Sequence, residues 1–479
     1  MSPRFGTDGI RGVANRDLTP ALVLALGEAA AQVLGRGPFL IGRDTRRSGS
    51  ALASALAAGL AAEGAEVWEL GVAPTPAVAY LCARHALPGA VISASHNPAQ
   101  DNGVKLIGAG GAKVEPDAER AIEAALDANL RRGLAPSPAP AVPPPACETE
   151  PGARGADGDA PRWSTRHPSR TPPELGEVRA RHELLGDYEE HLVGALEGRR
   201  LDGMSVVVDP ANGAGFALAP RVLARLGASV RVVAGEPDGA NINLRCGSTD
   251  TALLARTVRE ERADVGLALD GDADRLVAVD HEGRVVDGDR LLVLFALDLA
   301  ARGLLGVPVV ATTVMANLGV SRALDAAGIA VVETPVGDRH LGEAMAAKDL
   351  LLGGEQSGHL IFRSLSTTGD GLLTGILLLD LLERRGSSLA SLARTCMVPL
   401  PQRLRSVPVA HPDVAARDPG LLEEVARAEA ELAGRGRVLV RPSGTEPVVR
   451  IMVEAEAEAD ADQVLERLVR RVEGGVGRV

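Results

Sequence analysis

Aromatic residues are scarce in this chain: 5 Phe, 2 Tyr and 2 Trp make up 2% of its 479 residues. Hydrophobic residues of all kinds nevertheless reach 46% and charged residues 24%, which is typical of a folded globular protein. The core therefore has to be built from aliphatic side chains. At ~100–200 residues per domain, the length predicts three or four domains.

Cysteine is scarce as well. The chain has four, at Cys82, Cys147, Cys246 and Cys396. No two of them form a Cys-x-x-Cys pair, so the sequence indicates neither a zinc knuckle nor a disulfide framework. No apolar run reaches the ~18 residues of a membrane span, and the first residues lack a basic start followed by an apolar run. We therefore expect a cytoplasmic protein.

Positive charge is in deficit. The chain has 51 Lys and Arg against 63 Asp and Glu, which gives a formal net charge of −12. This disfavours nucleic acid or an anionic membrane surface as the main partner, because both attract proteins of the opposite sign. The negative net charge still allows an anionic small molecule to bind wherever a few basic side chains converge in a cleft.

Short apolar runs alternate with Ala/Leu-rich helical segments through most of the chain. The pattern appears first in residues 39–94, returns in residues 205–269, and appears again in residues 309–352. It predicts three consecutive α/β domains with mixed sheets. The remaining residues, 396–479, combine helix-like segments with two strand-like runs. This predicts a smaller C-terminal α+β domain, with all four domains arranged around a central cleft.

The predicted domain boundaries are 1–133, 178–287, 288–395 and 396–479. Between the first two lies a segment, 134–177, that holds 11 of the chain's 31 prolines and hardly any aliphatic residue. Such a composition cannot bury enough surface to offset the entropy lost on ordering. We predict a disordered insertion there.

Three aspartates alternate in the sequence DGDADR, which we call the aspartate loop (residues 270–275). Asp270, Asp272 and Asp274 follow a strand-like run, Val265–Leu269, and α/β domains place ligands at the carboxyl ends of strands. Carboxylates so spaced can converge on one hard cation, and Mg²⁺ is the expected one. Calcium in an EF-hand is disfavoured, since Arg275 stands where that loop has glycine. A solvated acidic turn is the other interpretation.

A serine closes another strand-like run in the sequence SASHNP, which we call the serine loop (residues 93–98). Ser95 is followed by His96 and Asn97. A hydroxyl at a strand end faces a cleft, but an adjacent histidine rarely points toward it as a base. By itself this loop is more often a capping turn.

Two further loops carry polar side chains suited to ligands. The sugar loop (residues 354–359) presents a carboxylate, a hydroxyl and an imidazole at alternate positions, at Glu355, Ser357 and His359. The first two suit sugar hydroxyls, and a histidine can transfer a proton near neutral pH. His96 and His359 are equally compatible with structural hydrogen bonding.

The cradle loop (residues 441–446) lies between two strand-like runs of the last domain. Its functional residues are Arg441, Ser443, Gly444 and Thr445. A guanidinium, two hydroxyls and backbone N–H groups around a glycine are the parts from which phosphate sites are made.

These four loops, in this order and one per domain, resemble the α-D-phosphohexomutase family over nearly the whole chain outside the proline-rich segment. The resemblance is to the branch that acts on glucosamine phosphate. It rests on FGTDGIRG from Phe5, TVMANLG from Thr313 and TTGDG from Thr367. It also rests on Gln356, where relatives acting on mannose and glucose phosphates usually carry methionine.

The resemblance implies an enzyme of amino-sugar metabolism that converts glucosamine 6-phosphate to glucosamine 1-phosphate. It implies a phosphate carried on Ser95, and Mg²⁺ held by that phosphoserine together with Asp270, Asp272 and Asp274. Glucosamine 1,6-bisphosphate is then the intermediate and activator. The implied partners are a small phosphosugar and, for assembly, a second copy of the chain in a homodimer.

The resemblance also implies roles for the remaining residues. Lys105 is the expected acid–base group, with His359 as the second candidate, although a lysine there is equally typical of a surface position. Arg11 and Arg275 are expected to stabilise phosphate charge, with His96 and Asn97 supporting Ser95. Ring hydroxyls and the second phosphate are expected to bind Glu355, Ser357, Arg441, Ser443, Gly444 and Thr445.

Some positions depart from the family pattern. The family segment usually reads NDGCGSTH, whereas NLRCGSTD stands here from Asn243 to Asp250, and His340 replaces a usual tyrosine. Sugar preference is therefore less well specified than the chemistry. The alternatives are a phosphomannomutase/phosphoglucomutase, a phosphosugar phosphatase, and a non-catalytic phosphosugar-binding protein.

Overall fold

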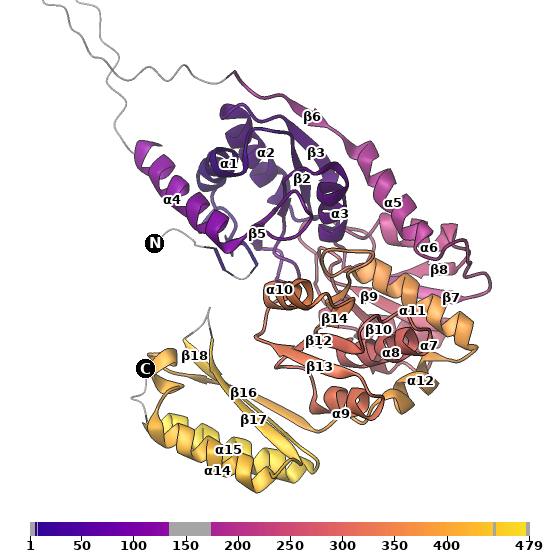
Figure 1. Ribbon diagram of the computed structural model, residues 1–479. Helices are drawn as coiled ribbons and strands as arrows, with labels where there is room; N and C mark the ends of the chain where they lie inside the picture. The colour runs from indigo at the N-terminus through magenta and orange to yellow at the C-terminus, as the bar shows by residue number, and fades with distance from the viewer. Residues whose placement is uncertain (1–4, 7, 134–173, 444–446, 476–479) are drawn as a thin grey trace, which may run out of the picture.

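The computed structural model describes residues 5–6, 8–133, 174–443 and 447–475 (Figure 1). All but the last four residues of the predicted insertion 134–177 lie outside this range. Among the described residues no helix is both long and apolar enough to cross a membrane.

The first domain is built on a sheet of strand order β1-β5-β4-β2-β3-β6, in which β5 runs antiparallel to both of its neighbours and the other pairs are parallel. Its strands are β1 (Ile10–Val13), β2 (Phe39–Arg43), β3 (Val67–Val72), β4 (Gly89–Ile92), β5 (Asp101–Ile107) and β6 (Val178–Ala180). Its helices are α1 (Pro20–Leu34), α2 (Gly49–Ala62), α3 (Thr75–His85) and α4 (Pro116–Gly133). Alternate side chains of a strand point to opposite faces. Accordingly, Phe39 and Ile41 pack with α1, α2 and α4, while Leu40 packs with α3.

The second sheet has the strand order β11-β10-β9-β7-β8. Its strands are β7 (Ser205–Asp209), β8 (Ser229–Val232), β9 (Val265–Leu269), β10 (Leu276–Asp280) and β11 (Val285–Val286). The helices of this region are η1 (His182–Leu184), α5 (Leu185–Gly194), α6 (Leu218–Arg225), η2 (Gly247–Thr249) and α7 (Ala252–Glu261). Leu254 and Val258 of α7 pack on one face of the sheet, against residues such as Val207 and Val277.

The third sheet has the order β13-β12-β14-β15, with only β15 antiparallel. Its strands are β12 (Val309–Thr313), β13 (Ala330–Thr334), β14 (Leu352–Gly354) and β15 (Leu360–Phe362). The helices are α8 (Gly288–Ala301), α9 (Leu318–Ala326), α10 (Asp338–Lys348), α11 (Gly371–Arg385) and α12 (Leu389–Cys396). Helix α11 returns to the second sheet, where Gly375 lies against Leu267.

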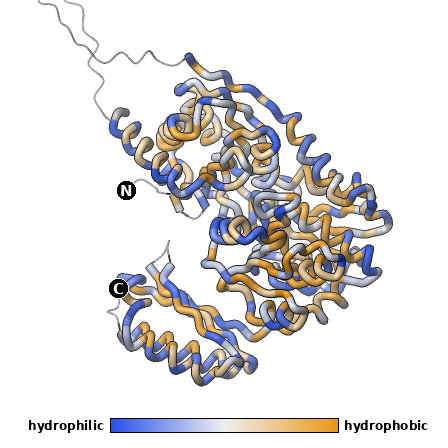
Figure 2. The backbone as a smooth tube through the Cα atoms, in the orientation of Figure 1, coloured by the Kyte–Doolittle hydropathy of each residue, from blue (hydrophilic) through white to orange (hydrophobic). Residues whose placement is uncertain are grey.

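The C-terminal domain is an antiparallel sheet of order β16-β18-β17 covered by helices. Its elements are β16 (Gln402–Pro408), α13 (Pro412–Ala415), α14 (Pro419–Leu432), β17 (Gly436–Pro442), β18 (Val448–Ala455) and α15 (Glu458–Gly475). Figure 1 shows this domain set apart from the rest, beside the third sheet. In Figure 2 its strands are mostly hydrophobic, while α14 and α15 mix hydrophobic and hydrophilic residues. This is the pattern of amphipathic helices covering a sheet.

The architecture of three α/β domains and a smaller α+β domain confirms the predicted fold class. The hydrophobic cores do not follow the division into four domains. One hydrophobic cluster runs through the second and third sheets, from Val206 and Leu267 to Leu352 and Leu372. The first and last domains have clusters of their own. The two central domains therefore share one core.

Residues 176–180 are attached to the first sheet. The Gly176 N–H donates to the Ala61 carbonyl, and the Val67 N–H donates to the Glu177 carbonyl at 2.8 Å. Strand β6 then pairs with β3. The predicted start of the second domain, residue 178, thus falls within a strand of the first sheet. A strand of three residues, all of them exposed, has no apolar pattern by which a sequence could reveal it.

Candidate active site

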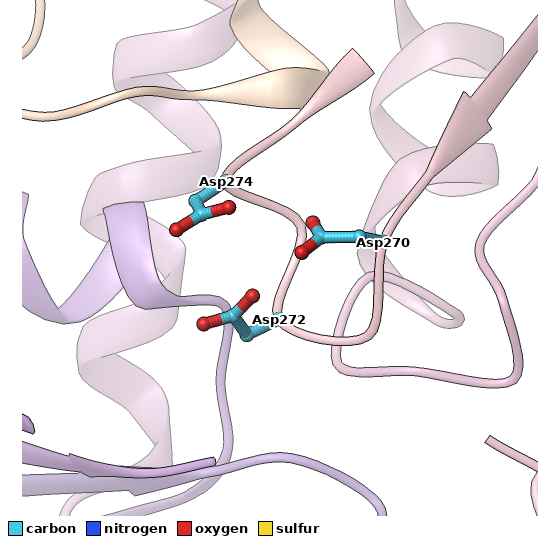
Figure 3. A group of neighbouring side chains, drawn as sticks. All are labelled: Asp270, Asp272 and Asp274. Carbon is cyan, nitrogen blue, oxygen red and sulfur yellow. The ribbon is translucent and has the colours of Figure 1, made fainter. Parts of the chain in front are cut away.

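The aspartate loop joins β9 to β10, so it begins at the carboxyl end of a buried strand. Asp270 and Asp272 are fully buried, and Asp274 is 4% exposed. One carboxylate oxygen from each lies within 4.8 Å of the others. Figure 3 shows the three side chains pointing toward a common space. The alternate spacing in the sequence thus does bring the carboxylates together.

The chemistry of these carboxylates fits a divalent cation. Burial and the charges of Asp274 and Asp272 raise the pKa of Asp270 well above its usual value. One oxygen each of Asp272 and Asp274 is buried without a hydrogen-bond partner among the described residues. Unpaired buried carboxylate oxygens are costly unless a cation joins them. Three oxygen donors of this kind suit Mg²⁺.

The serine loop lies directly against the aspartate loop. Ser95 is fully buried, and its Oγ donates to Asp270 Oδ2 at 2.6 Å. Its backbone is left-handed, with φ of 51°, and its N–H donates to Ser93 Oγ at 2.9 Å. His96 Nδ1 lies 3.3 Å from Ser95 Oγ, and burial lowers the pKa of His96 to about 4.

A buried arginine fixes the backbone of the serine loop. The Arg46 side chain follows β2 and is 1% exposed. Its Nη2 donates to the carbonyls of Ser95 and Asn97, each at 2.9 Å, and its Nε donates to Asp44 Oδ2 at 2.8 Å. The same carboxylate accepts from Ser93 Oγ at 2.6 Å. Asp44 and Arg46 therefore hold Ser95 through both its N–H and its carbonyl.

Lys105 projects from β5 into the same site and is 3% exposed. Its Nζ donates to Asp272 Oδ2 at 2.7 Å, and lies 3.2 Å from Asp8 Oδ2 and 3.6 Å from Asp274 Oδ2. Burial acts to lower the pKa of Lys105, but the neighbouring carboxylates outweigh it and the pKa is raised. Lys105 is a buried ammonium group here, which excludes the surface interpretation.

Two guanidinium groups flank the carboxylates. Arg11, in β1, pairs with Asp8, and Arg275 Nε lies 3.7 Å from Asp274 Oδ1. The Nε atoms of both arginines are buried without a hydrogen-bond partner among the described residues. Each can therefore still donate to an anion, as expected for groups that stabilise phosphate charge.

The His359 ring lies between two protein groups. It is 2% exposed, its Nε2 accepts from the Gly369 N–H at 3.0 Å, and its Nδ1 faces Asp274 Oδ2 at 3.7 Å. Because a backbone N–H can only donate, Nε2 carries no proton. Both ring nitrogens are thus directed at protein groups. Gly369, the glycine of TTGDG, packs over the ring, where a Cβ would lie 2.5 Å from it. No local sequence pattern indicates this contact.

The other two residues of the sugar loop lie together. Ser357 Oγ donates to Glu355 Oε2 at 3.2 Å, and both side chains are partly exposed. Gln356 points away from them, donating to Asp289 Oδ2 at 3.2 Å and lying 3.5 Å from Gln402 Oε1. Gln356, on which the predicted sugar preference rests, therefore contacts the start of the C-terminal domain.

The cradle loop is described only in part, since Gly444 and Thr445 lie outside the described residues. Arg441, the residue before the last of β17, lies directly opposite Arg450 of β18. Burial and the nearby Arg450 charge lower the pKa of Arg441. Like charges facing each other across a sheet are destabilising, and an anion bound between them would relieve this. The Ser443 N–H donates to the Val448 carbonyl at 3.0 Å.

Comparison with known proteins identifies this combination. Phosphoglucomutase/phosphomannomutase domain families match the chain in order, with alpha/beta/alpha domains I, II and III over residues 2–132, 187–283 and 287–399, and the C-terminal domain over residues 404–471. A phosphoglucosamine mutase of Salinispora tropica is 46% identical over 482 residues, covering 98% of each chain. The chain belongs to the α-D-phosphohexomutase family.

Solved structures show the same fold over the whole phosphohexomutase chain. A phosphoglucomutase/phosphomannomutase family protein from Burkholderia thailandensis has a TM-score of 0.77 at 23% identity, covering 100% of this chain and 99% of that one. Aspergillus fumigatus N-acetylphosphoglucosamine mutase, in complex with GlcNAc-6P and magnesium, has a TM-score of 0.63 at 19% identity, with coverages of 99% and 96%. The predicted family and the predicted enzyme class, an isomerase, are confirmed.

Several residues of this phosphohexomutase site were missed from the sequence. Asp44 and Arg46 come three and five residues after the strand-like run Phe39–Ile41, so a strand-end criterion like the one that selected Ser95 would have found them. Asn243 and Arg450 carry no such signal. Their positions depend on loop and strand pairings that a single sequence does not reveal.

Proposed function

We propose that this phosphohexomutase interconverts glucosamine 6-phosphate and glucosamine 1-phosphate through a phosphate carried on Ser95. The observation that carries the proposal is the 2.6 Å contact between Ser95 Oγ and Asp270 within a buried set of three carboxylates. The sugar is assigned because the Salinispora tropica relative is named a phosphoglucosamine mutase. Glucosamine 1,6-bisphosphate is the proposed intermediate.

Mg²⁺ would be held by Asp270, Asp272, Asp274 and one oxygen of the phosphate on Ser95. When bound, it supplies positive charge that neutralises the phosphoryl group during transfer. Arg11 and Arg275 add two guanidinium groups whose Nε atoms have no hydrogen-bond partner among the described residues. Ser95 itself is buried, so water has poor access to the phosphorylated hydroxyl.

Lys105 is the proposed acid–base group. In the first transfer the bond between phosphorus and Ser95 Oγ breaks, a bond from phosphorus to a sugar hydroxyl oxygen forms, and that hydroxyl loses its proton. In the second transfer the other phosphate of the bisphosphate moves from its sugar oxygen to Ser95 Oγ, and that sugar oxygen gains a proton. The proton lost in the first transfer is taken up by Lys105 and returned in the second. Lys105 Nζ lies 2.7 Å from Asp272 and 3.6 Å from Asp274, and both carboxylates favour its protonated form. When these carboxylates also bind a cation, they hold the Lys105 proton less strongly.

His359 is assigned a different role from the one expected. Its Nε2 accepts from Gly369 and its Nδ1 faces Asp274, so we propose that it orients Asp274 instead of moving a proton. The remaining groups bind the sugar. Glu355 and Ser357 hold ring hydroxyls, while Arg441 and the cradle loop hold the phosphate that is not reacting.

Mass spectrometry of the intact protein tests the phosphate carrier. The purified enzyme should be heavier by about 80 Da, the mass of one phosphate, with the modification mapping to Ser95. The Ser95→Ala variant should lack this mass and lose isomerase activity. Undiminished activity in that variant would exclude the proposed mechanism.

Coupled assays with glucosamine, glucose and mannose phosphates test the sugar. We expect a clear preference for the glucosamine phosphates. A preference for mannose 1-phosphate would favour the phosphomannomutase/phosphoglucomutase alternative. Phosphate release faster than isomerisation would favour a phosphatase, and binding without turnover would favour a non-catalytic phosphosugar-binding protein.

A further inference from the structure

The main chain of the serine loop is held by a side chain from the second domain as well as by Arg46. Asn243 Nδ2 donates to the Ser95 carbonyl at 2.9 Å and to the Asn97 carbonyl at 3.0 Å. These are the same two carbonyls that accept from Arg46 Nη2. Arg46 belongs to the first domain and Asn243 to the segment that follows β8. One amide group thus joins the serine loop to the domain that carries the aspartate loop.

Asn243 is itself firmly placed in the second domain. Its backbone is left-handed, with φ of 57°, and its N–H donates to the Ala211 carbonyl at 2.9 Å. The preceding side chain, Ile242, is 1% exposed. Gly271 of the aspartate loop packs on the same Ser95 carbonyl, so closely that a Cβ there would lie 2.5 Å from the oxygen.

The direct contact between the two loops changes during the reaction. Ser95 Oγ donates its proton to Asp270 only while the hydroxyl is free. Once Oγ carries a phosphate it has no proton to donate, and the loop needs contacts that do not involve Oγ to keep its place. The bonds from Asn243 meet this requirement, because they act on main-chain carbonyls, which phosphorylation of Oγ leaves chemically unchanged.

We propose that Asn243 is a positioning residue that keeps the serine loop in register with the aspartate loop in both the phosphorylated and the unphosphorylated enzyme. This inference rests on the proposed function, in which Ser95 carries the phosphate. Displacement of a reacting group by about 1 Å can reduce turnover about 100-fold. Loss of Asn243 should therefore reduce kcat, while the binding groups of the sugar and cradle loops remain unchanged.

The test replaces one atom. In Asn243→Asp an oxygen takes the place of the Nδ2 donor and faces two carbonyl oxygens, so the loop is repelled instead of held. We expect kcat with glucosamine 6-phosphate to fall about 10- to 100-fold, with KM within about twofold of the wild-type value. Asn243→Ala removes the donor without repulsion and should give a smaller fall in kcat. It also serves as the test variant if Asn243→Asp does not fold.

Asn241→Asp is the matched control. Asn241 lies in the same segment and makes the same kind of bond, from its Nδ2 to the Glu236 carbonyl at 3.0 Å, but it does not contact the serine loop among the contacts described. This variant should keep the wild-type kcat. Single-turnover transfer from phosphorylated Ser95 to glucosamine 6-phosphate should slow only in the Asn243 variants.

Each contrary result has a distinct meaning. Wild-type kcat and single-turnover rate in folded Asn243 variants would overturn the inference, as would a loss confined to KM, or an equal loss in Asn241→Asp. If the wild-type enzyme carries no phosphate on Ser95 and isomerises no phosphosugar, the proposed function fails first, and the inference fails with it.

Discussion

At the scale of single residues, the conformation of Ser95 explains why this position needs serine in particular. A φ of 51° is unusual for a residue with a side chain, and it is most unfavourable for β-branched residues. Glycine would suit the backbone but has no hydroxyl. Threonine has the hydroxyl but also an extra methyl group on Cβ. Serine is the smallest side chain that combines an acceptor for phosphate with this backbone.

The Ser95→Thr variant should therefore still be phosphorylated, but less efficiently than wild type. Backbone strain of about 1–3 kcal/mol is expected at such a position, and we expect kcat to fall about 10- to 100-fold. Intact-protein mass spectrometry and kcat measure the two effects. Ser95→Ala gives the baseline without a hydroxyl. A threonine variant with wild-type turnover would show that the left-handed backbone imposes no such restriction.

The reassignment of His359 leads to a second prediction. Its Nε2 accepts from Gly369, and a glutamine oxygen can accept in the same way. His359→Gln should therefore keep kcat within about tenfold of wild type, with the pH dependence of kcat unchanged.

In Lys105→Met, kcat should fall about 100-fold or more, as expected when a general acid–base group is removed. The pH profile of kcat distinguishes the two, and a loss of one of its limbs in His359→Gln would restore the original assignment.

At the scale of elements, the glycine of the aspartate loop is as restricted as its carboxylates. A Cβ at Gly271 would lie 2.5 Å from the Ser95 carbonyl oxygen, which is closer than real Cβ atoms approach. Gly271→Ala should therefore separate the aspartate and serine loops and reduce kcat at least about 100-fold. Ala273→Gly is the matched control. Ala273 has φ of 60°, which glycine adopts more easily, so that variant should be at least as stable as wild type.

The first turn of α8 contains a carboxyl group that makes stability depend on pH. Asp289 is 1% exposed, and burial raises its pKa to about 7. The raised pKa means that the folded state binds this proton more tightly than the unfolded chain does. Folding stability from this group is therefore present at low pH and is lost as pH rises from about 4 to about 7, by at most about 1.4 kcal/mol per pH unit.

Asp289→Asn should remove this dependence. The asparagine oxygen can still accept from the Asn317 N–H, and its amide can occupy the place of the carboxylate oxygen that has no hydrogen-bond partner among the described residues. The free energy of unfolding, measured in urea, should increase in the variant relative to wild type as the pH rises from 5 to 7. An identical pH dependence in the two proteins would contradict the raised pKa.

The elements also show what the sequence could and could not reveal. Buried strands such as Val265–Leu269, and the aspartates that follow them, were predicted because hydrophobic runs and strand ends are local features. The position of His359 was not, because it depends on Gly369 packing over the ring from a later turn. The contacts of Asn243 and the pairing of Arg441 with Arg450 depend on how distant segments meet. Local sequence patterns do not indicate which distant segments will be in contact.

At the scale of the whole molecule, the C-terminal domain stands apart energetically. Its core cluster contains residues of that domain alone, from Val407 to Val472. Its described links to the third sheet are mainly polar, as between Arg437 and the Ala316 carbonyl or between Arg322 and Glu456. Domains joined in this way usually unfold as separate units.

Ile451→Ala tests this separation. Ile451 is fully buried in β18, and its truncation should cost about 2–5 kcal/mol. Hydrogen exchange followed by mass spectrometry should show faster exchange in residues 402–475 and no change in the aspartate loop. Leu292→Ala, in the core shared by the second and third sheets, should instead destabilise both central domains together. Faster exchange throughout the chain in Ile451→Ala would contradict independent unfolding.

The core shared by the central domains also affects the order in which the chain can fold during synthesis. Domains emerging from the ribosome generally fold as units, starting from the N-terminus. The second sheet is complete at Val286, yet its face toward α11 stays uncovered until residues 371–385 have been made. The aspartate loop, at the end of that sheet, therefore reaches its final structure only after most of the chain has been translated.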